Sequence, residues 1–285
     1  MKKSILRSFF LLSITSTSLN TVVFAQDFAQ YLGENALEIS DLEHLNDAIY
    51  EQLKTFRYLA MGEMHGTVEP AVFTLGLANL LTQKGDSVLV GLEIGEDAMT
   101  KYLEEQTDQS IYDSEFFSNG DADGRGTIAM AKLIARLRLN NRVKLFFFDV
   151  TTGNYTDFRD SLMYLNIKRE LLAKPNYKLI TLSGNVHNMI VSRNGQKKMT
   201  LYLMEDPELA LSDSTCSLSH HFNRGAMLNN TGNGLELRKV DYGPAVYTTA
   251  TPFENYLILY KGKFQSPYSG LLFTTVVSPA EMVKK

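Results

Sequence analysis

The chain has 285 residues, 44% of them hydrophobic and 21% charged, a globular composition that excludes disordered, collagen-like and coiled-coil proteins. Its 28 lysines and arginines are outnumbered by 32 aspartates and glutamates and form no basic block, so we expect neither nucleic acid nor an anionic membrane as a partner. The single cysteine, Cys216, excludes an internal disulfide and a cysteine-based metal cage.

The first 25 residues have the three parts of a secretory signal peptide. A basic start over residues 2–7 precedes a short apolar core over 8–14, and small residues end the segment at Ala25. The apolar run is too short to span a bilayer. We therefore expect cleavage near Ala25, a periplasmic or secreted location without integral membrane association, and a single mature domain over residues 26–285, because no linker or repeat divides it.

Helical and extended patterns then alternate along the chain. Ser40 and Glu43 have the spacing of a capping box, which predicts a helix start. Apolar periodicity and Gly and Pro stop signals give the remaining boundaries. The predicted helices cover 42–56, 68–84, 97–106, 128–139 and 156–172, and the predicted strands cover 56–61, 87–92, 143–148 and 177–182.

The predicted strands are continuous apolar runs, not alternating ones. A strand reads this way when it is buried on both faces, as in a parallel sheet covered by helices. We therefore predict an α/β fold with a mainly parallel central sheet and helices on both faces. The C-terminal third differs, with β segments predicted over 198–204, 236–240, 255–260 and 271–277, which extend the sheet or add an antiparallel edge.

An acidic residue or a histidine follows each of the first four predicted strands. Glu63 and His65 follow the first, Glu93 the second, Asp149 the third and His187 the fourth. Because ligands bind beyond the carboxyl ends of parallel strands, we predict that these side chains meet at one rim and form the functional site. Glycines flank the first pair, which permits a tight turn and a close approach of backbone to a ligand.

Structural alternatives exist for several of these residues. Glu69 falls in the first turn of a helix, where an acid interacts favourably with the macrodipole. Glu93 could form an ion pair with an arginine, and Arg159 one with Asp160 on a helix surface. Arg125 follows a turn that partly imitates a calcium loop, but residue 130 is a methionine where a bidentate glutamate is needed, which excludes an EF-hand.

Other histidines carry less weight. His44 is predicted on a helix surface, and the tandem pair His220 and His221 in a polar loop. The chain has no nucleophile elbow, P-loop, dinucleotide fingerprint or His-Glu-x-x-His motif. The remaining candidates, histidine and glutamate, suit general-base activation of water or binding of a divalent metal.

The ordered motifs resemble the erythromycin-esterase-like superfamily, which includes haem-binding iron-uptake lipoproteins and, more distantly, Tiki-type metalloproteases. The resemblance covers about residues 45–190. The motifs that support the resemblance are Gly62-Glu63-x-His65-Gly66-Thr67-x-Glu69, Glu93, Arg159-Asp160-x-x-Met163-x-x-Asn166 and Gly184-Asn185-x-His187. One residue separates Glu63 from His65, as in the iron-uptake lipoproteins, whereas the esterases have two.

The resemblance implies that His65 is the general base for water, and that His187 polarises the substrate carbonyl or assists the leaving group. Glu63 and Glu93 would orient the base, or hold a metal together with both histidines. Arg159 and Arg125 would stabilise the oxyanion. The predicted substrate-binding residues are Glu69, Arg125, Asn185 and Asp149.

We therefore expect an exported hydrolase that acts on an ester or related bond of a small molecule, since a neutral imidazole with a pKa near about 6.5 accepts a proton at neutral pH. A periplasmic haem- or iron-binding protein, a metal-dependent peptidase and an inactive scaffold are the alternatives. The cofactor is correspondingly open, between none, a divalent metal and haem.

Overall fold

A computed structural model describes residues 26–119, 123–150, 158–230, 234–243 and 249–283. The predicted signal peptide over residues 1–25 lies outside the described residues. Within the described ranges, no helix combines the length and the apolar character needed to cross a membrane.

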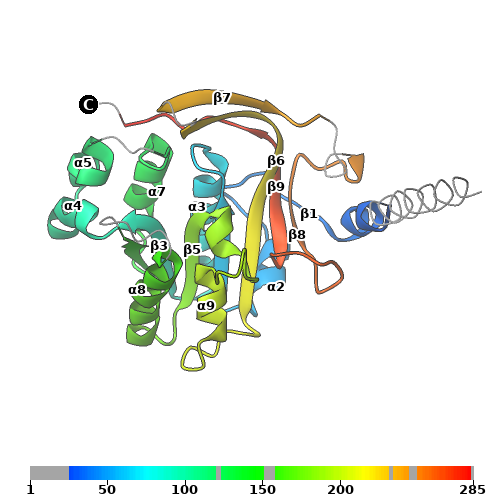
Figure 1. Cartoon of the computed structure of the whole chain (residues 1–285), viewed down its shortest axis with the longest axis horizontal. Helices are drawn as coiled ribbons and strands as arrows, with labels where there is room; N and C mark the ends of the chain where they lie inside the picture. Colours follow the sequence, from blue (N-terminus) through cyan, green and yellow to red (C-terminus); the bar gives the residue numbers. More distant parts are fainter. Residues whose placement is uncertain (1–25, 120–122, 151–157, 231–233, 244–248, 284–285) are drawn as a thin grey trace, which may run out of the picture.

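One mixed sheet organises the described chain (Figure 1). Its strands follow the spatial order β1-β8-β9-β6-β2-β5-β3-β4, and β7 pairs with the far end of β6. The strand bounds are β1 Leu37–Glu38, β2 Tyr58–Glu63, β3 Val88–Gly95, β4 Val143–Asp149, β5 Lys178–Gly184, β6 Thr215–Asn230, β7 Leu235–Asp241, β8 Asn255–Leu259 and β9 Gly270–Val277.

The centre of the sheet is parallel, as predicted. All pairings from β9 through β6, β2, β5 and β3 to β4 are parallel, so the carboxyl ends of these strands share one edge. Antiparallel pairs occur where β8 meets β1 and β9, and where β7 meets β6. The C-terminal third therefore both extends the parallel sheet and adds antiparallel edges.

Helices cover both faces of the sheet (Figure 1). Alternation along β2 shows the two cores: Leu59 and Met61 join a cluster with α2, α3 and α7, whereas Tyr58 and Ala60 join a cluster with α8 and α9. Residues 26–35 are also helical. The bounds are α2 Asp47–Leu53, α3 Glu69–Gln83, α4 Thr100–Glu105, α5 Asp108–Asp113, α6 Glu115–Ser118, α7 Ile128–Leu137, α8 Arg159–Ala173 and α9 Met199–Glu205, with 3-10 turns η1 Asp97–Met99 and η2 Asn185–Asn188.

Two local predictions are wrong. The helix predicted over 42–56 begins only at Asp47, because the Asp41 carboxylate accepts the Glu43 N–H and closes a turn, and Asn46 is the N-cap. Residues 198–204, predicted as a β segment, form α9. Met199 and Leu203 lie one helical turn apart and bury together in the core beside α8, which the β reading of this apolar run overlooked.

The tandem histidines are also placed differently from the prediction. They belong to β6, a long strand that the sequence analysis missed, and not to a polar loop. His220 is 2% exposed, and its Nε2 lies 3.0 Å from Thr274 Oγ1 on β9. Burial lowers the pKa of His220 to about 3, so this imidazole is neutral in the folded protein.

Candidate active site

The predicted rim residues do converge. The carboxyl ends of β2, β3, β4 and β5 bring together a network of charged side chains, which we call the charged cluster. Arg125 enters it from the loop before α7, and Arg159 and Asp160 enter from the first turn of α8. The charged cluster consists of Glu63, His65, Glu93, Arg125, Asp149, Arg159, Asp160 and His187.

Glu63 and His65 form the first pair of the charged cluster. His65 Nδ1 lies 3.0 Å from Glu63 Oε1, with the Glu63 side chain 5% exposed and the His65 side chain 22% exposed. Burial alone would lower the pKa of His65, but the charge and hydrogen bond of Glu63, with the charge of Glu93, outweigh it and raise the pKa to about 9. The expectation of a neutral His65 at pH 7 is therefore wrong, because a pKa of about 9 keeps the imidazole protonated there.

Glu93 is the buried centre of the charged cluster. Its Oε2 accepts the Gly184 N–H at 2.7 Å, and its Oε1 accepts Arg159 Nη2 at 2.5 Å. Arg125 Nη1 lies 3.4 Å and His187 Nε2 3.6 Å from the same Oε1. Burial would raise the pKa of Glu93, yet the surrounding histidines and arginines hold it well below its usual range.

Asp149 holds the two arginines together. Its carboxylate accepts Arg159 Nε and Nη2 at 2.9 and 2.7 Å, and Arg125 Nη1 at 2.9 Å. Arg125 is fixed further by Asp123, with Nη2 2.8 Å from Asp123 Oδ2. Bidentate carboxylate pairing orients a guanidinium rigidly. Asp149, predicted to bind substrate, thus acts on the arginines in this structure.

His187 has its own carboxylate partner, Asp160, which is not among the predicted site residues. His187 Nδ1 lies 2.8 Å from Asp160 Oδ1, and Asp160 is held by Lys198 Nζ at 3.1 Å and Met199 N–H at 2.9 Å. When His187 Nδ1 carries the proton and donates it to Asp160, the lone pair of Nε2 faces Arg159 Nη1 at 3.2 Å. The adjacency of Asp160 to Arg159 in the Arg-Asp-x-x-Met-x-x-Asn motif was the available signal.

Glycines make room for this geometry. A Cβ at Gly184 would lie 3.1 Å from His65 Nε2, so the imidazole packs where a side chain would otherwise stand. Gly66, with φ of 79°, turns directly against β6, because a Cβ there would come within 1.8 Å of the Leu228 carbonyl oxygen. The turn after β2 therefore depends on a residue without a side chain.

Two predicted site residues serve other contacts. The Asn185 amide bonds both backbone groups of His220 on β6, at 3.1 and 2.9 Å. Glu69 Oε1 accepts the Ser278 N–H at 2.8 Å, while its buried Oε2 has no hydrogen-bond partner among the residues that the structure describes. Burial raises the pKa of Glu69. In the described chain no hydrogen bond or ion pair joins Asn185 or Glu69 side chains to the charged cluster.

The four predicted metal ligands, Glu63, His65, Glu93 and His187, are not arranged to coordinate a metal ion. Both oxygens of Glu93 already accept hydrogen bonds, and Glu63 is paired with His65. Within the described ranges, no group of three or more His, Cys, Asp or Glu side chains is placed to hold a metal ion. Two arginines beside Glu93 also repel a cation.

Comparison with known proteins identifies the fold. No family model and no curated protein matches the sequence. A Bacillus cereus protein has a TM-score of 0.64 at 12% identity, covering 92% of this chain and 99% of its own. A succinoglycan biosynthesis protein has a TM-score of 0.64 at 8% identity, covering 91% and 98%.

The erythromycin esterase EreC, solved as a mutant in its open conformation, has a TM-score of 0.58 at 12% identity, covering 84% of this chain and 95% of its own. At such low identity the similarity concerns the fold alone. The chain thus has a fold similar to that of the erythromycin esterase, as the motif resemblance implied.

Proposed function

We propose that this chain is a hydrolase of an ester or a related bond in a small molecule, with His65 as the base that activates water. The observation that carries the proposal is the Glu63–His65 pair at the rim, whose Nδ1 is held at 3.0 Å while Nε2 makes no hydrogen bond to the described chain. A carboxylate behind an imidazole fixes its tautomer and directs the other nitrogen outward. His65 Nε2 is thus the proton acceptor.

Arg159 supports the same chemistry. Four of its five N–H groups are directed at Asp149, Glu93 and His187, which leaves one N–H on Nη1 without an acceptor in the described chain. A fixed cationic donor of this kind stabilises the oxyanion that forms when a carbonyl is attacked. His187, backed by Asp160, acts as a positioning residue that accepts the other Nη1 proton.

The reaction then proceeds in two proton transfers. Nε2 of a neutral His65 takes a proton from water as the water oxygen attacks the carbonyl carbon, and the carbonyl oxygen becomes an anion beside Arg159. The tetrahedral species collapses, the bond to the leaving group breaks, and the imidazolium returns its proton to the leaving oxygen. Because the pKa of His65 is about 9, the active neutral form increases with pH below that value.

The first test is hydrolysis of a panel of p-nitrophenyl esters by the purified mature chain and by His65→Ala. We expect the substitution to lower kcat/KM by about 100-fold or more, the usual contribution of a general base. His44→Ala is the matched control, because His44 also pairs with an acid, at 2.9 Å, but its side chain is 78% exposed. Equal loss in both variants, or none in His65→Ala, would refute the assignment.

The pH profile distinguishes a base from an acid at the same residue. We expect kcat/KM to rise about tenfold per pH unit and to level off near pH 9. A rate that falls through pH 9 would instead make His65 a proton donor. Visible absorption after haem addition and elemental analysis test the alternatives: a stoichiometric haem or metal that is lost in His65→Ala would replace the proposal.

A further inference from the structure

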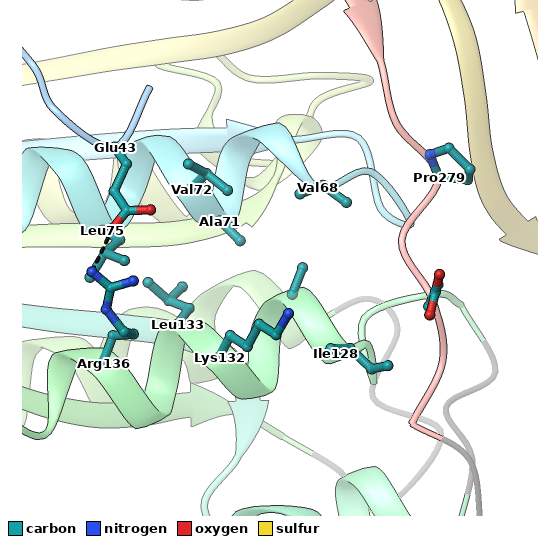
Figure 2. Close-up of a pocket in the computed structure, with 12 residues that line it drawn as sticks. Glu43, Val68, Ala71, Val72, Leu75, Ile128, Lys132, Leu133, Arg136 and Pro279 are labelled. Atoms are coloured by element: carbon teal, nitrogen blue, oxygen red, sulfur yellow. Dashed lines mark hydrogen bonds and ion pairs between the residues drawn. The ribbon is translucent and has the colours of Figure 1, made fainter. Parts of the chain in front are cut away.

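A cavity outside the charged cluster lies between helices α3 and α7. It has a volume of about 410 Å³ and is bordered at one end by the C-terminal segment, residues 278–283 (Figure 2). Cavities that bind small molecules have volumes of about 300 to 1,000 Å³. The apolar lining includes Val68, Ala71, Leu75, Ile128, Ala129 and Leu133.

Helix α3 is apolar on more than its sheet-facing side. A helix that covers one face of a sheet needs only one apolar stripe, with polar residues opposite. After Glu69, however, α3 has no charged residue up to its end at Gln83, and both Ala71 and Val72 face the cavity. Helix α7 contributes apolar side chains to the opposite wall. Ala71, Leu75 and Leu133 are buried where α3 packs on α7, and the partly exposed apolar lining is Val68, Val72, Ile128 and Ala129.

Two acids and two bases line this cavity: Glu43, Glu281, Lys132 and Arg136. Arg136, at one end, is paired with Glu43 from the segment before α2. Lys132, one helical turn earlier, makes no hydrogen bond or ion pair within the part of the chain that the structure describes. Figure 2 shows Lys132 between the Glu43–Arg136 pair and Pro279, with its ammonium turned toward the space between the helices. Glu281 also lines the cavity, and its backbone oxygen accepts the Ile128 N–H at 2.7 Å.

We propose that this cavity binds a single-chain amphiphile with one carboxylate, such as a medium-chain fatty acid. Its hydrocarbon chain would replace water along the apolar walls of α3 and α7, which favours binding in proportion to the apolar area covered. Its carboxylate would pair with Lys132, which makes no ion pair in the described chain, whereas Arg136 is already paired with Glu43. The cavity residues are separate from the charged cluster, so this site does not depend on the proposed hydrolase activity.

Isothermal titration of the full chain with decanoate tests the site directly. We expect one equivalent to bind, about tenfold weaker binding in Lys132→Ala, and about tenfold weaker binding of decanol, which lacks the charge. Lys144→Ala is the matched control and should bind normally, because Lys144 is an exposed lysine on β4 outside the cavity. Ala129→Phe should abolish binding, because the ring would occupy the space between the helices.

Each result bears on the proposal. No saturable binding of decanoate, or unchanged binding in Ala129→Phe, would overturn the site. Equal affinities for decanol and decanoate, or unchanged affinity in Lys132→Ala, would overturn the assignment of the carboxylate. Circular dichroism and thermal unfolding confirm that Ala129→Phe folds. If it does not, Val72→Phe on the facing helix blocks the same cavity from a partly exposed position and gives the same readout.

Discussion

The substitution Glu63→Gln tests the interaction between the Glu63 charge and His65, and the test needs no substrate. The glutamine oxygen can still accept the Nδ1 proton of His65 at a similar position, so the change removes a charge and keeps the hydrogen bond. Burial lowers the pKa of His65 and Glu63 is the main group that raises it to about 9. We therefore expect the pKa of His65 in the variant to fall to about 6.5 or lower.

The magnitude follows from the pKa change. A decrease of about 2.5 in pKa corresponds to roughly 3 kcal/mol of differential interaction with the protonated imidazole. Because the folded-state pKa of His65 lies above the unfolded value near 6.5, the stabilisation is fully present below about pH 6.5 and disappears as pH rises through about 9. Glu63→Gln should therefore reduce the free energy of unfolding more at pH 6 than at pH 10, by up to about 3 kcal/mol.

The assay is a pH titration of the histidine ring resonances by NMR, with urea unfolding at pH 6 and pH 10. The chain has five histidines, so His65→Ala identifies the resonance of interest. Asp41→Asn, which removes the exposed acid beside His44, is the control and should leave the His65 titration unchanged. A wild-type His65 that titrates near 6.5, or the same pKa in Glu63→Gln, would refute the pairing and the base assignment built on it.

Three further predictions concern the residues that hold the cluster. Gly184→Ala places a Cβ 3.1 Å from His65 Nε2, so it should lower ester hydrolysis about tenfold by displacing the imidazole a few tenths of an ångström, and unchanged kcat/KM would contradict the packing. Glu93→Gln removes the buried centre of the cations and should cost about 3–5 kcal/mol in urea unfolding. The exposed Glu96→Gln, its control, should cost less than about 1 kcal/mol. Asp160→Asn should lower kcat about 100-fold or more with little change in KM, because the His187 tautomer is no longer fixed, and an equal rise in KM would assign it to binding instead.

The parallel sheet could be predicted because a strand that is buried on both faces has a recognisable local sequence pattern. Tyr58–Glu63 and Val88–Gly95 are entirely buried, and the sequence shows this as apolar runs without alternation. The rim followed from the same runs, since the carboxyl ends of parallel strands share an edge. The Glu63–His65 pair was accessible for a simpler reason, because its members are two residues apart.

Other features depended on contacts distant in sequence. β6 carries serine, histidine and asparagine that read as a polar loop, yet pairing with β2 and β9 makes it a strand. The helical form of α9 likewise depends on a core shared with α8. No local pattern distinguishes these outcomes, because tertiary burial overrides the intrinsic preference of a short segment.

By itself, the sequence determined which strands are buried and which titratable groups stand at their ends. The tertiary structure decided the chemical state of those groups. His187 acquired Asp160, Glu93 acquired two arginines, and the pKa of His65 rose to about 9. The physical reason is that a side-chain pKa depends on the burial and charges within a few ångströms, and for Glu93 those charges come from residues far away in the chain.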